Sequence, residues 1–302
     1  MTEPQRETMK LWDGEISYLE WGTAGPSLLF CHATGYNAET YRSLLQPLSE
    51  KMHVYATDAR GHGFTSLPAT PGIAKDWIVY RDDTIRFLDG LDGRPMIIAG
   101  HSMGATAGVL AALLRPDLVR ALVLIEPVFA PAHSFRRRIM RALPIRRRIP
   151  DLAERAQRRR DTFDSFEQVF SAYKGRGAFQ TWPDEVLLDY LKGGLLPVED
   201  SSRVRLACPP AWEAQTFGSA PYGVTGMVGR LQCPVTILYA GHSNTCPDSE
   251  AAQFARNHKG TRRVRIAKAS HFLPMEYPDQ TRAEILRIAR LLDTEANVKI
   301  RR

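Results

Sequence analysis

The sequence predicts an α/β fold built on a largely parallel sheet, and two observations predict it. Short apolar runs alternate with helical patterns at both ends of the chain, which is typical of parallel strands covered by helices on both faces. Between about residues 130 and 230 the alternation stops, and the chain becomes arginine-rich, then aromatic, then rich in glycine and proline. We therefore expect one α/β core from residues 1–130 and 231–302, with a mostly helical insertion, residues 131–230, between two core strands.

Each expected strand is a short apolar run that ends at a turn, and each expected helix has an apolar period near 3.6 residues. The expected strands are residues 27–31, 54–57, 95–99, 121–125, 235–239 and 263–267. The expected helices are residues 40–50 (with Asn37 as an alternative start), 78–91, 103–115, 248–258 and 274–292. Ligands gather at the carboxyl edge of parallel sheets, so the residues that follow these strands are the first candidates for a site.

The composition is that of an ordinary globular protein, with 302 residues, 44% of them hydrophobic and 24% charged. The N-terminal residues lack the apolar core of a secretory signal, and no apolar run approaches the ~18 residues that span a bilayer. We therefore expect a cytoplasmic protein. Four widely spaced cysteines without a C-x-x-C motif fit a reducing compartment and exclude a zinc ribbon or a disulfide scaffold: Cys31, Cys208, Cys233 and Cys246.

The net charge of +7 is concentrated in one segment. Residues 136–160 hold eleven arginines and two acids, a charge of +9, so the rest of the chain sums to −2. A basic surface over the whole protein is absent, and we expect no nucleic-acid partner. The segment itself has two interpretations: a solvated helix face, or a patch that binds an anionic substrate or makes weak contact with a membrane surface.

The pentapeptide Gly-His-Ser-Met-Gly at residues 100–104 is the strongest functional signal. It matches G-x-S-x-G, with a predicted strand before it and a predicted helix after it, the context in which this pattern carries a nucleophilic serine. The sharp turn exposes the Ser102 hydroxyl, and the flanking glycines allow neighbouring backbone to approach closely. A chance glycine–serine turn, the alternative, would not need this context.

A serine hydroxyl needs a base to act as a nucleophile near neutral pH. His271 follows the last predicted strand and precedes the closing helix, so we expect it on a loop at the same sheet edge as Ser102. The alternative is a surface histidine, of which the chain has others. His133, His242 and His258 lack the placement of His271.

The chain resembles the α/β-hydrolase family over residues 10–130 and 231–292. The family's motifs occur here in the family's order: His32, the Asp-Ala-Arg-Gly-His-Gly segment at 58–63, Ser102 and His271. Within the family, the His-Ala-Thr-Gly sequence at residues 32–35 is most similar to that of bacterial serine esterases. The resemblance implies an α/β-hydrolase fold with a helical cap inserted after the sixth core strand.

The triad acid is where the sequence departs from the family's common pattern. The usual position follows the strand at residues 235–239, and there the chain has Ser243 and Asn244, neither of which can carry a negative charge. Glu126 ends the preceding core strand, a position that some family members use instead. Asp248 lies a few residues late, where an acid is also explained as a helix N-cap. We favour Glu126 and keep Asp248 as the alternative acid.

A tetrahedral intermediate needs two backbone N–H donors for its oxyanion. Met103, directly after the serine, supplies one, and the resemblance places the other at Thr34, in the loop after the first core strand. Asp58, Arg60 and His62 raise the question of a metal. We favour a loop held by an ion pair and turn glycines, because no metal-ligand spacing is present. No phosphate- or dinucleotide-binding motif occurs either, so we expect no cofactor.

Together these residues predict a serine hydrolase that cleaves a small-molecule carboxylic ester with an apolar part, through Ser102, His271 and Glu126. The aromatic residues of 163–182 are expected to line or roof an apolar pocket. A lactonase, a carbon–carbon-bond hydrolase or a cofactor-free perhydrolase would use the same residues. A haloalkane dehalogenase or an epoxide hydrolase needs an aspartate where this chain has Ser102. A non-catalytic ligand-binding member of the fold is the alternative from another class.

Overall fold

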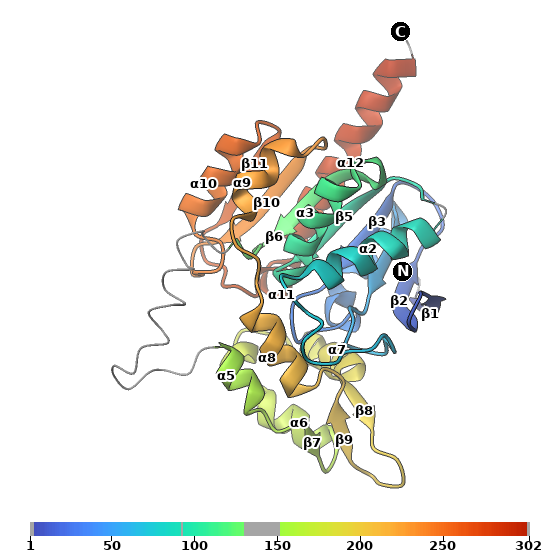
Figure 1. Ribbon diagram of the computed structural model, residues 1–302, viewed down its shortest axis with the longest axis vertical. Coiled ribbons are helices and arrows are strands. Elements are labelled where there is room, and N and C mark those ends of the chain that lie inside the picture. Colours follow the sequence, from blue (N-terminus) through green and yellow to red (C-terminus); the bar gives the residue numbers. More distant parts are fainter. Residues whose placement is uncertain (1–2, 92, 130–151, 301–302) are drawn as a thin grey trace.

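A single eight-stranded sheet forms the centre of the computed structural model, which describes residues 3–91, 93–129 and 152–300 (Figure 1). The strand order is β1-β2-β4-β3-β5-β6-β10-β11. β1 and β2 are antiparallel to their neighbours, and the other strands are mutually parallel. The strands are β1 (Gln5–Lys10), β2 (Glu15–Trp21), β3 (Ser27–Cys31), β4 (His53–Thr57), β5 (Met96–His101), β6 (Val119–Ile125), β10 (Val235–Ala240) and β11 (Thr261–Ile266). This mostly parallel sheet confirms the predicted fold class.

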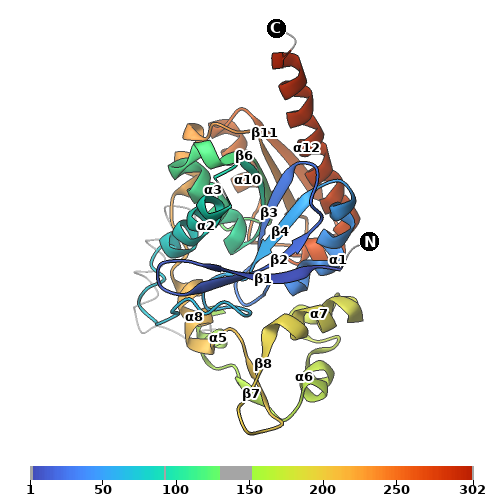
Figure 2. The same cartoon turned by 90° about the vertical axis from the view of Figure 1, so that its right-hand side faces the viewer.

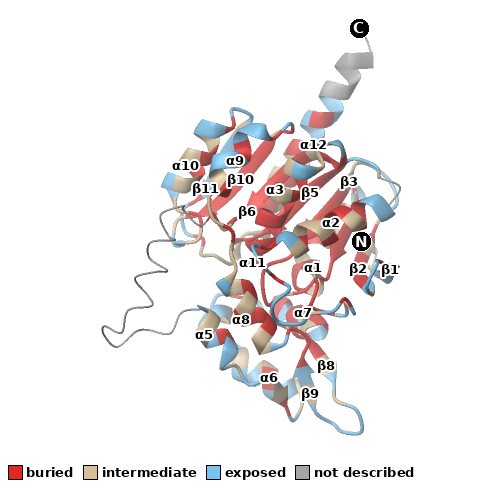
Figure 3. Cartoon of the chain, in the orientation of Figure 1, coloured by how far each residue is buried: buried red, intermediate tan, exposed pale blue. Residues whose placement is uncertain are grey.

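Helices cover both faces of the sheet (Figure 2). Successive strand residues point to opposite faces, so in β3 Leu28 and Phe30 join one apolar cluster while Leu29 and Cys31 join the other. The first cluster packs under α1, α11 and α12, and the second under α2, α3 and α10. The helices are α1 (Arg42–Leu45), α2 (Ile78–Gly90), α3 (Met103–Leu114), α10 (Asp248–Asn257), α11 (Leu273–Glu276) and α12 (Pro278–Ile300). Figure 3 shows the central strands buried throughout.

Of the described residues between β6 and β10, residues 152–218 fold beside the carboxyl edge of the sheet, whereas Val224–Met227 pack beside α10 (Figure 1). The predicted insertion comprises residues 131–230. Its first residues, including the 136–151 part of the arginine-rich segment, lie outside the described residues. Its helices are α5 (Leu152–Gln157), α6 (Phe166–Tyr173), α7 (Asp184–Gly194), α8 (Pro210–Gly218) and α9 (Val224–Met227). A small antiparallel sheet, β7 (Thr162–Phe163), β9 (Val204–Leu206) and β8 (Leu195–Pro197), accompanies them. The sequence prediction of a mostly helical segment missed these strands, which are too short to show a period.

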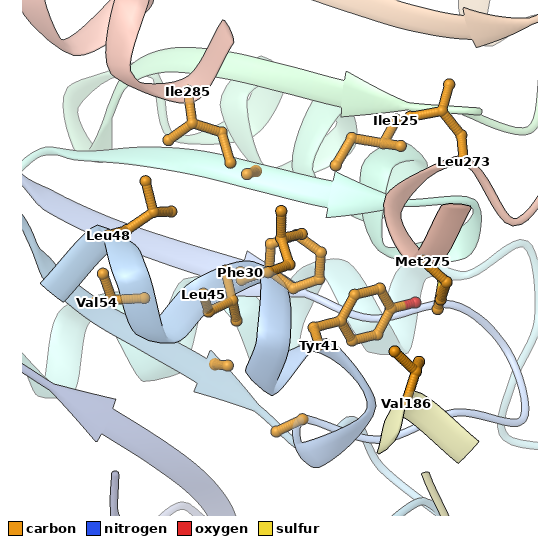
Figure 4. Close-up of a cluster of buried hydrophobic side chains, with 14 of the residues drawn as sticks. Phe30, Tyr41, Leu45, Leu48, Val54, Ile125, Val186, Leu273, Met275 and Ile285 are labelled. Carbon is orange, nitrogen blue, oxygen red and sulfur yellow. The ribbon is translucent and has the colours of Figure 1, made fainter. Parts of the chain in front are cut away.

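The insertion is packed against the core rather than held apart from it. In Figure 4, Val186 of α7 lies in one buried cluster with Tyr41 and with Met275 of α11, the short helix that follows His271. On the other side, the Trp212 indole donates to the Arg60 carbonyl at 2.9 Å. The apolar contacts and this hydrogen bond fix the insertion over the sheet edge.

Three local predictions differ from the structure. Strands β1 and β2 have no counterpart among the predicted strands. β1 is an exposed edge strand without an apolar alternation, so its sequence carries no strand signal. The predicted helix 40–50 is a single α-turn flanked by 3-10 turns, and Pro47 lies in the second of them. The predicted closing helix 274–292 is two helices, with the break at Tyr277, because Pro278 disfavours a helical conformation at the residue before it. Within the described ranges, no helix is both long and apolar enough to cross a membrane.

Gly104 lets helix α3 approach the end of β3 closely. A Cβ on Gly104 would lie 2.6 Å from the His32 carbonyl oxygen and closer still to that of Cys31. We expect Gly104→Ala to lower the free energy of unfolding by about 1–3 kcal/mol, because backbone on both sides must move. Gly218→Ala, at the end of α8 with open space around its Cβ position, is the matched control and should change stability by less than about 0.5 kcal/mol. Urea denaturation measures both, and equal effects would contradict the close approach.

Candidate active site

Two neighbouring strands of the sheet end in strained residues. Ser102 follows β5 with φ +53°, and Glu126 follows β6 with φ +46°. Both still take part in the ladder: the Ser102 N–H donates to the Ile125 carbonyl at 2.9 Å, and the Glu126 N–H donates to the Leu238 carbonyl at 2.8 Å. Such a backbone costs about 1–3 kcal/mol for a non-glycine residue and is found mainly where function requires it. The two turns project both side chains from the same sheet edge.

His271 joins these two side chains. Its Nε2 lies 3.2 Å from Ser102 Oγ, and its Nδ1 lies 3.2 Å from Glu126 Oε2. His271 sits between β11 and α11, on the loop predicted from the sequence. A carboxylate accepts hydrogen bonds, so the Nδ1 side carries the proton and Nε2 is free to accept from the serine hydroxyl. The structure thus brings together three residues that the sequence predicts for a catalytic triad.

Glu126 is fully buried and is held by two further donors. The Ala240 N–H donates to its Oε1 at 2.6 Å, and the Ser243 hydroxyl donates to its Oε2 at 2.5 Å. Ser243 is one of the two residues, with Asn244, at which the sequence places the usual position of the acid. Its hydroxyl therefore orients the carboxylate supplied by the neighbouring strand.

Asp248 is not brought to His271. It is the first residue of α10, where it accepts a hydrogen bond from the Tyr239 hydroxyl at 2.6 Å and lies 3.7 Å from Arg263. No hydrogen bond or ion pair connects Asp248 with His271 within the described part of the chain. An acid in the first turn of a helix is explained by the helix dipole alone.

Thr34 and Met103 belong to the two segments that approach each other closely at Gly104. Met103 precedes Gly104 in α3, and Thr34 follows His32 in the loop after β3. Met103 begins α3, where backbone N–H groups have no acceptor within the helix and the dipole favours negative charge. Thr34 lies in the loop after β3, next to Gly35, whose φ of +80° suits a residue without a side chain. Both Thr34 and Ser102 line one cavity.

Two buried histidines hold this loop. His62 Nε2 accepts from the Gly35 N–H at 3.0 Å, and His32 Nε2 accepts from the Ala59 N–H at 2.8 Å. Each ring's Nδ1 faces a carbonyl oxygen, so both rings are neutral with a fixed tautomer. His32 is thus a supporting residue of the loop.

Arg60 anchors the segment after β4, as the ion-pair interpretation predicts. It is buried and donates to Asp83 at 2.8 Å and to Asp13 at 2.7 Å. Asp58 accepts from the Ala38 N–H at 2.8 Å and from Arg6 at 2.8 Å. In the described ranges, no group of three or more histidine, cysteine or acidic side chains could hold a metal ion.

A chain of hydrogen bonds that sequence reasoning missed connects the two loops of the site. The Ala33 N–H donates to Tyr41 Oη at 3.2 Å, Tyr41 Oη lies 2.8 Å from His101 Nδ1, and His101 Nε2 lies 2.8 Å from the His271 carbonyl oxygen. His101 is the second residue of the G-x-S-x-G motif. That position was the available signal, although nothing in the sequence pairs it with Tyr41.

A cavity of about 920 Å³ opens above Ser102 and His271. Its wall is mainly apolar and aromatic, with Phe163, Tyr173 and Phe179 from the insertion among the lining residues. Phe166 and Phe170, also in the predicted aromatic stretch, pack instead against the apolar cluster under α1 and α12. The candidate nucleophile and base therefore face a cavity large enough for a small organic molecule.

The fold and this site identify the class of protein. A family model described as the alpha/beta hydrolase family matches residues 28–284. The match covers well over half of the chain, so the chain belongs to the α/β-hydrolase family.

Individual relatives match this chain either over only part of its length or at low sequence identity. A 2-(acetamidomethylene)succinate hydrolase of Mesorhizobium japonicum is 38% identical over 103 residues, but this match spans only 34% of the chain and 36% of the relative. An esterase of Mycobacterium tuberculosis is 26% identical over 297 residues, 96% of the chain and 91% of that protein. A crystal structure of E-2-(acetamidomethylene)succinate hydrolase superposes with a TM-score of 0.76 at 23% identity, covering 95% of this chain and 99% of the other. That likeness shows the fold alone.

Acid is expected to destabilise the protein below about pH 6.5, because three buried histidines are neutral in the fold. Burial lowers the pKa of His32 to about 4 and the pKa of His62 to about 3, and it holds the pKa of His101 well below its ordinary value. The unfolded chain takes up protons at these residues near pH 6.5, whereas the folded chain does not until far lower pH. The free energy of unfolding therefore falls as pH falls through this window.

Urea denaturation at pH 7.5, 6.5 and 5.5 measures this dependence. Between pH 6.5 and 5.5 we expect a loss of about 1 kcal/mol for each of the three histidines. If the free energy of unfolding stays constant from pH 7.5 to 5.5, the prediction is wrong, because these rings then take up protons in the folded protein at the same pH as in the unfolded chain.

Proposed function

We propose that the protein is a serine hydrolase that cleaves a carboxylic ester through Ser102, His271 and Glu126. The observation that carries the proposal is the chain of two 3.2 Å contacts from Ser102 Oγ through His271 to the buried Glu126, at the wall of a large cavity. Family membership supports a hydrolase. An esterase aligned over nearly the whole chain supports ester chemistry.

In the proposed reaction, His271 Nε2 takes the hydroxyl proton as Ser102 Oγ attacks the ester carbonyl. The N–H groups of Met103 and Thr34 donate hydrogen bonds to the developing oxyanion, aided by the N-terminus of α3. His271 then protonates the leaving alcohol, and the acyl group stays on the serine. Water, deprotonated by His271, attacks the acyl-enzyme and releases the acid. Glu126 keeps the imidazole in the required tautomer and stabilises its charged form.

The proposed substrate is a small ester with an apolar part. Aromatic side chains of the proposed cap, such as Phe163 and Phe179, form much of the cavity wall, and a wall of this kind favours burial of apolar surface. A lactone or another activated carbonyl fits the same proposed residues, and a substrate panel separates these possibilities.

A fluorophosphonate probe tests whether Ser102 is a reactive nucleophile. We expect stoichiometric labelling of Ser102, located by peptide mass spectrometry, because a base and an oxyanion site activate its hydroxyl. Ser102→Ala should abolish labelling and lower kcat/KM for p-nitrophenyl acetate by about 10⁴-fold or more. Ser49→Ala, outside the cavity lining, is the matched control. A Ser102 that stays unlabelled in folded protein would favour a non-catalytic binding protein.

The identity of the acid is tested by Glu126→Gln against Asp248→Asn. We expect the first to lower kcat by about 10³- to 10⁴-fold, because the amide cannot stabilise the imidazolium. The second should leave kcat within about twofold, since Asp248 contacts Tyr239 and not His271. Thermal unfolding checks that both variants fold. Loss of turnover only in Asp248→Asn would overturn the assignment of Glu126.

A further inference from the structure

A group of polar side chains from the insertion lines the cavity in addition to Ser102 and His271. Arg159, which follows α5, donates to Glu213 of α8 at 2.6 Å. Its other terminal nitrogen lies 3.3 Å from the Tyr173 hydroxyl oxygen and 3.5 Å from that of Tyr190. All four side chains line the cavity that contains Ser102. We call Arg159, Glu213, Tyr173 and Tyr190 the polar cluster.

The polar cluster lies next to the loop that carries Thr34. A Cβ on Gly35 would lie 2.5 Å from Glu213 Oε1, so the carboxylate sits directly on this loop. Tyr36, the next residue, packs edge-on against Tyr190 with ring centroids 5.6 Å apart. A substrate whose carbonyl is held at Thr34 can therefore reach the polar cluster with a substituent a few bonds away.

The two phenols have hydrogen-bonding capacity that the protein does not use. A guanidinium only donates, so the oxygens of Tyr173 and Tyr190 accept from Arg159, and each phenolic hydrogen needs a separate acceptor. In the part of the chain that the structure describes, no carbonyl or carboxylate accepts from either hydroxyl. Burial raises the pKa of Tyr190 to about 12, so this hydroxyl keeps its hydrogen at neutral pH.

Charge within the polar cluster is already balanced. Glu213 is buried and its carboxylate neutralises Arg159, so the guanidinium orients and polarises the two phenols without leaving a net charge. What the polar cluster itself presents to the cavity is two O–H donors, and Arg155 and Arg160 also line this cavity. Such donors favour a ligand oxygen over a methylene group, because a buried donor without an acceptor costs free energy.

We propose that Tyr173 and Tyr190, positioned by the Arg159–Glu213 pair, bind a hydrogen-bond-accepting oxygen of the substrate, remote from the scissile ester. The substrate class is then an ester whose acyl chain carries a ketone or carboxylate oxygen in addition to its apolar part. This inference rests on the proposed function for the reacting end of the substrate. The recognition itself depends only on the cavity and the two phenols.

Matched p-nitrophenyl esters test the proposal. Three acyl chains of similar length are compared: heptanoyl, 6-oxoheptanoyl and the half-ester of pimelic acid. A shorter series of pentanoyl, 4-oxopentanoyl and the half-ester of glutaric acid tests a second distance between the ester carbonyl and the remote oxygen. The measured quantity is kcat/KM for each oxygenated ester divided by that for its alkyl counterpart. Comparing this ratio between variants removes differences in intrinsic ester reactivity. Selectivity for the ketone or for the carboxylate identifies a neutral or an anionic acceptor.

We expect Tyr173→Phe and Tyr190→Phe each to lower this ratio about 2- to 10-fold, the range of one hydrogen bond to a neutral acceptor. Both changes keep the ring that packs in the wall. Tyr18→Phe, on β2 and outside the cavity lining, is the matched control and should leave the ratio unchanged. If the polar cluster only fastens the insertion, the phenylalanine variants lose stability while the ratio stays at the wild-type value, and the proposal is wrong.

Binding to Ser102→Ala separates this proposal from the proposed function. Methyl heptanoate, methyl 6-oxoheptanoate and monomethyl pimelate are titrated by the fluorescence of the tryptophans, since Trp77 lines the cavity. Tighter binding of an oxygenated ester, reduced about 2- to 10-fold by Tyr190→Phe, supports the polar cluster even if the wild-type protein hydrolyses none of the esters. Equal binding of all three esters overturns it, whatever the hydrolytic activity.

Discussion

The site depends on two parallel strands that end in the left-handed region while their last N–H groups stay in the sheet. Ser102 and Glu126 carry this strain, and the ladder bonds to β6 and β10 hold each of them in place. Neither turn would persist on an exposed edge, because about 1–3 kcal/mol of strain must be offset by surrounding structure. Here the strands are buried on both faces. The central position of β5 and β6 is therefore what allows both side chains to leave the sheet side by side.

Because the proposed acid, Glu126, directly follows β6, the loop after β10 has a different role from the one in the family's common pattern. The loop contributes the Ser243 hydroxyl, which donates to the same Glu126 oxygen that faces His271, while Ala240 at the end of β10 donates its N–H to the other oxygen. In the proposed triad the charge is fully buried. The relatives' names describe varied reactions, and the proposed chemistry of this chain rests first on Ser102, His271 and Glu126.

Much of the core could be predicted because parallel buried strands are continuous apolar runs, and the residues directly after them meet at one edge. Ser102 and Glu126 are such residues, and His271 lies on the loop that follows the last strand at the same edge, which is why their meeting was foreseeable although their catalytic roles stay a proposal. The rest depends on contacts without a local signal. β1 is a polar edge strand, the strands of the insertion have two or three residues, and Arg159 meets Glu213 54 positions away. No periodicity encodes such pairings.

The hydrogen bonds through Tyr41 and His101 all run in one direction. The His271 carbonyl can only accept, so His101 Nε2 carries the hydrogen, Nδ1 accepts from Tyr41, and the Tyr41 oxygen accepts from Ala33. This series of hydrogen bonds joins the loop after β3 to the loop between β11 and α11. The His101 ring therefore has both of its nitrogens satisfied only when the loop before α11 is in place, so the backbone that carries His271 and the loop that carries Thr34 are held by one connected pair of side chains.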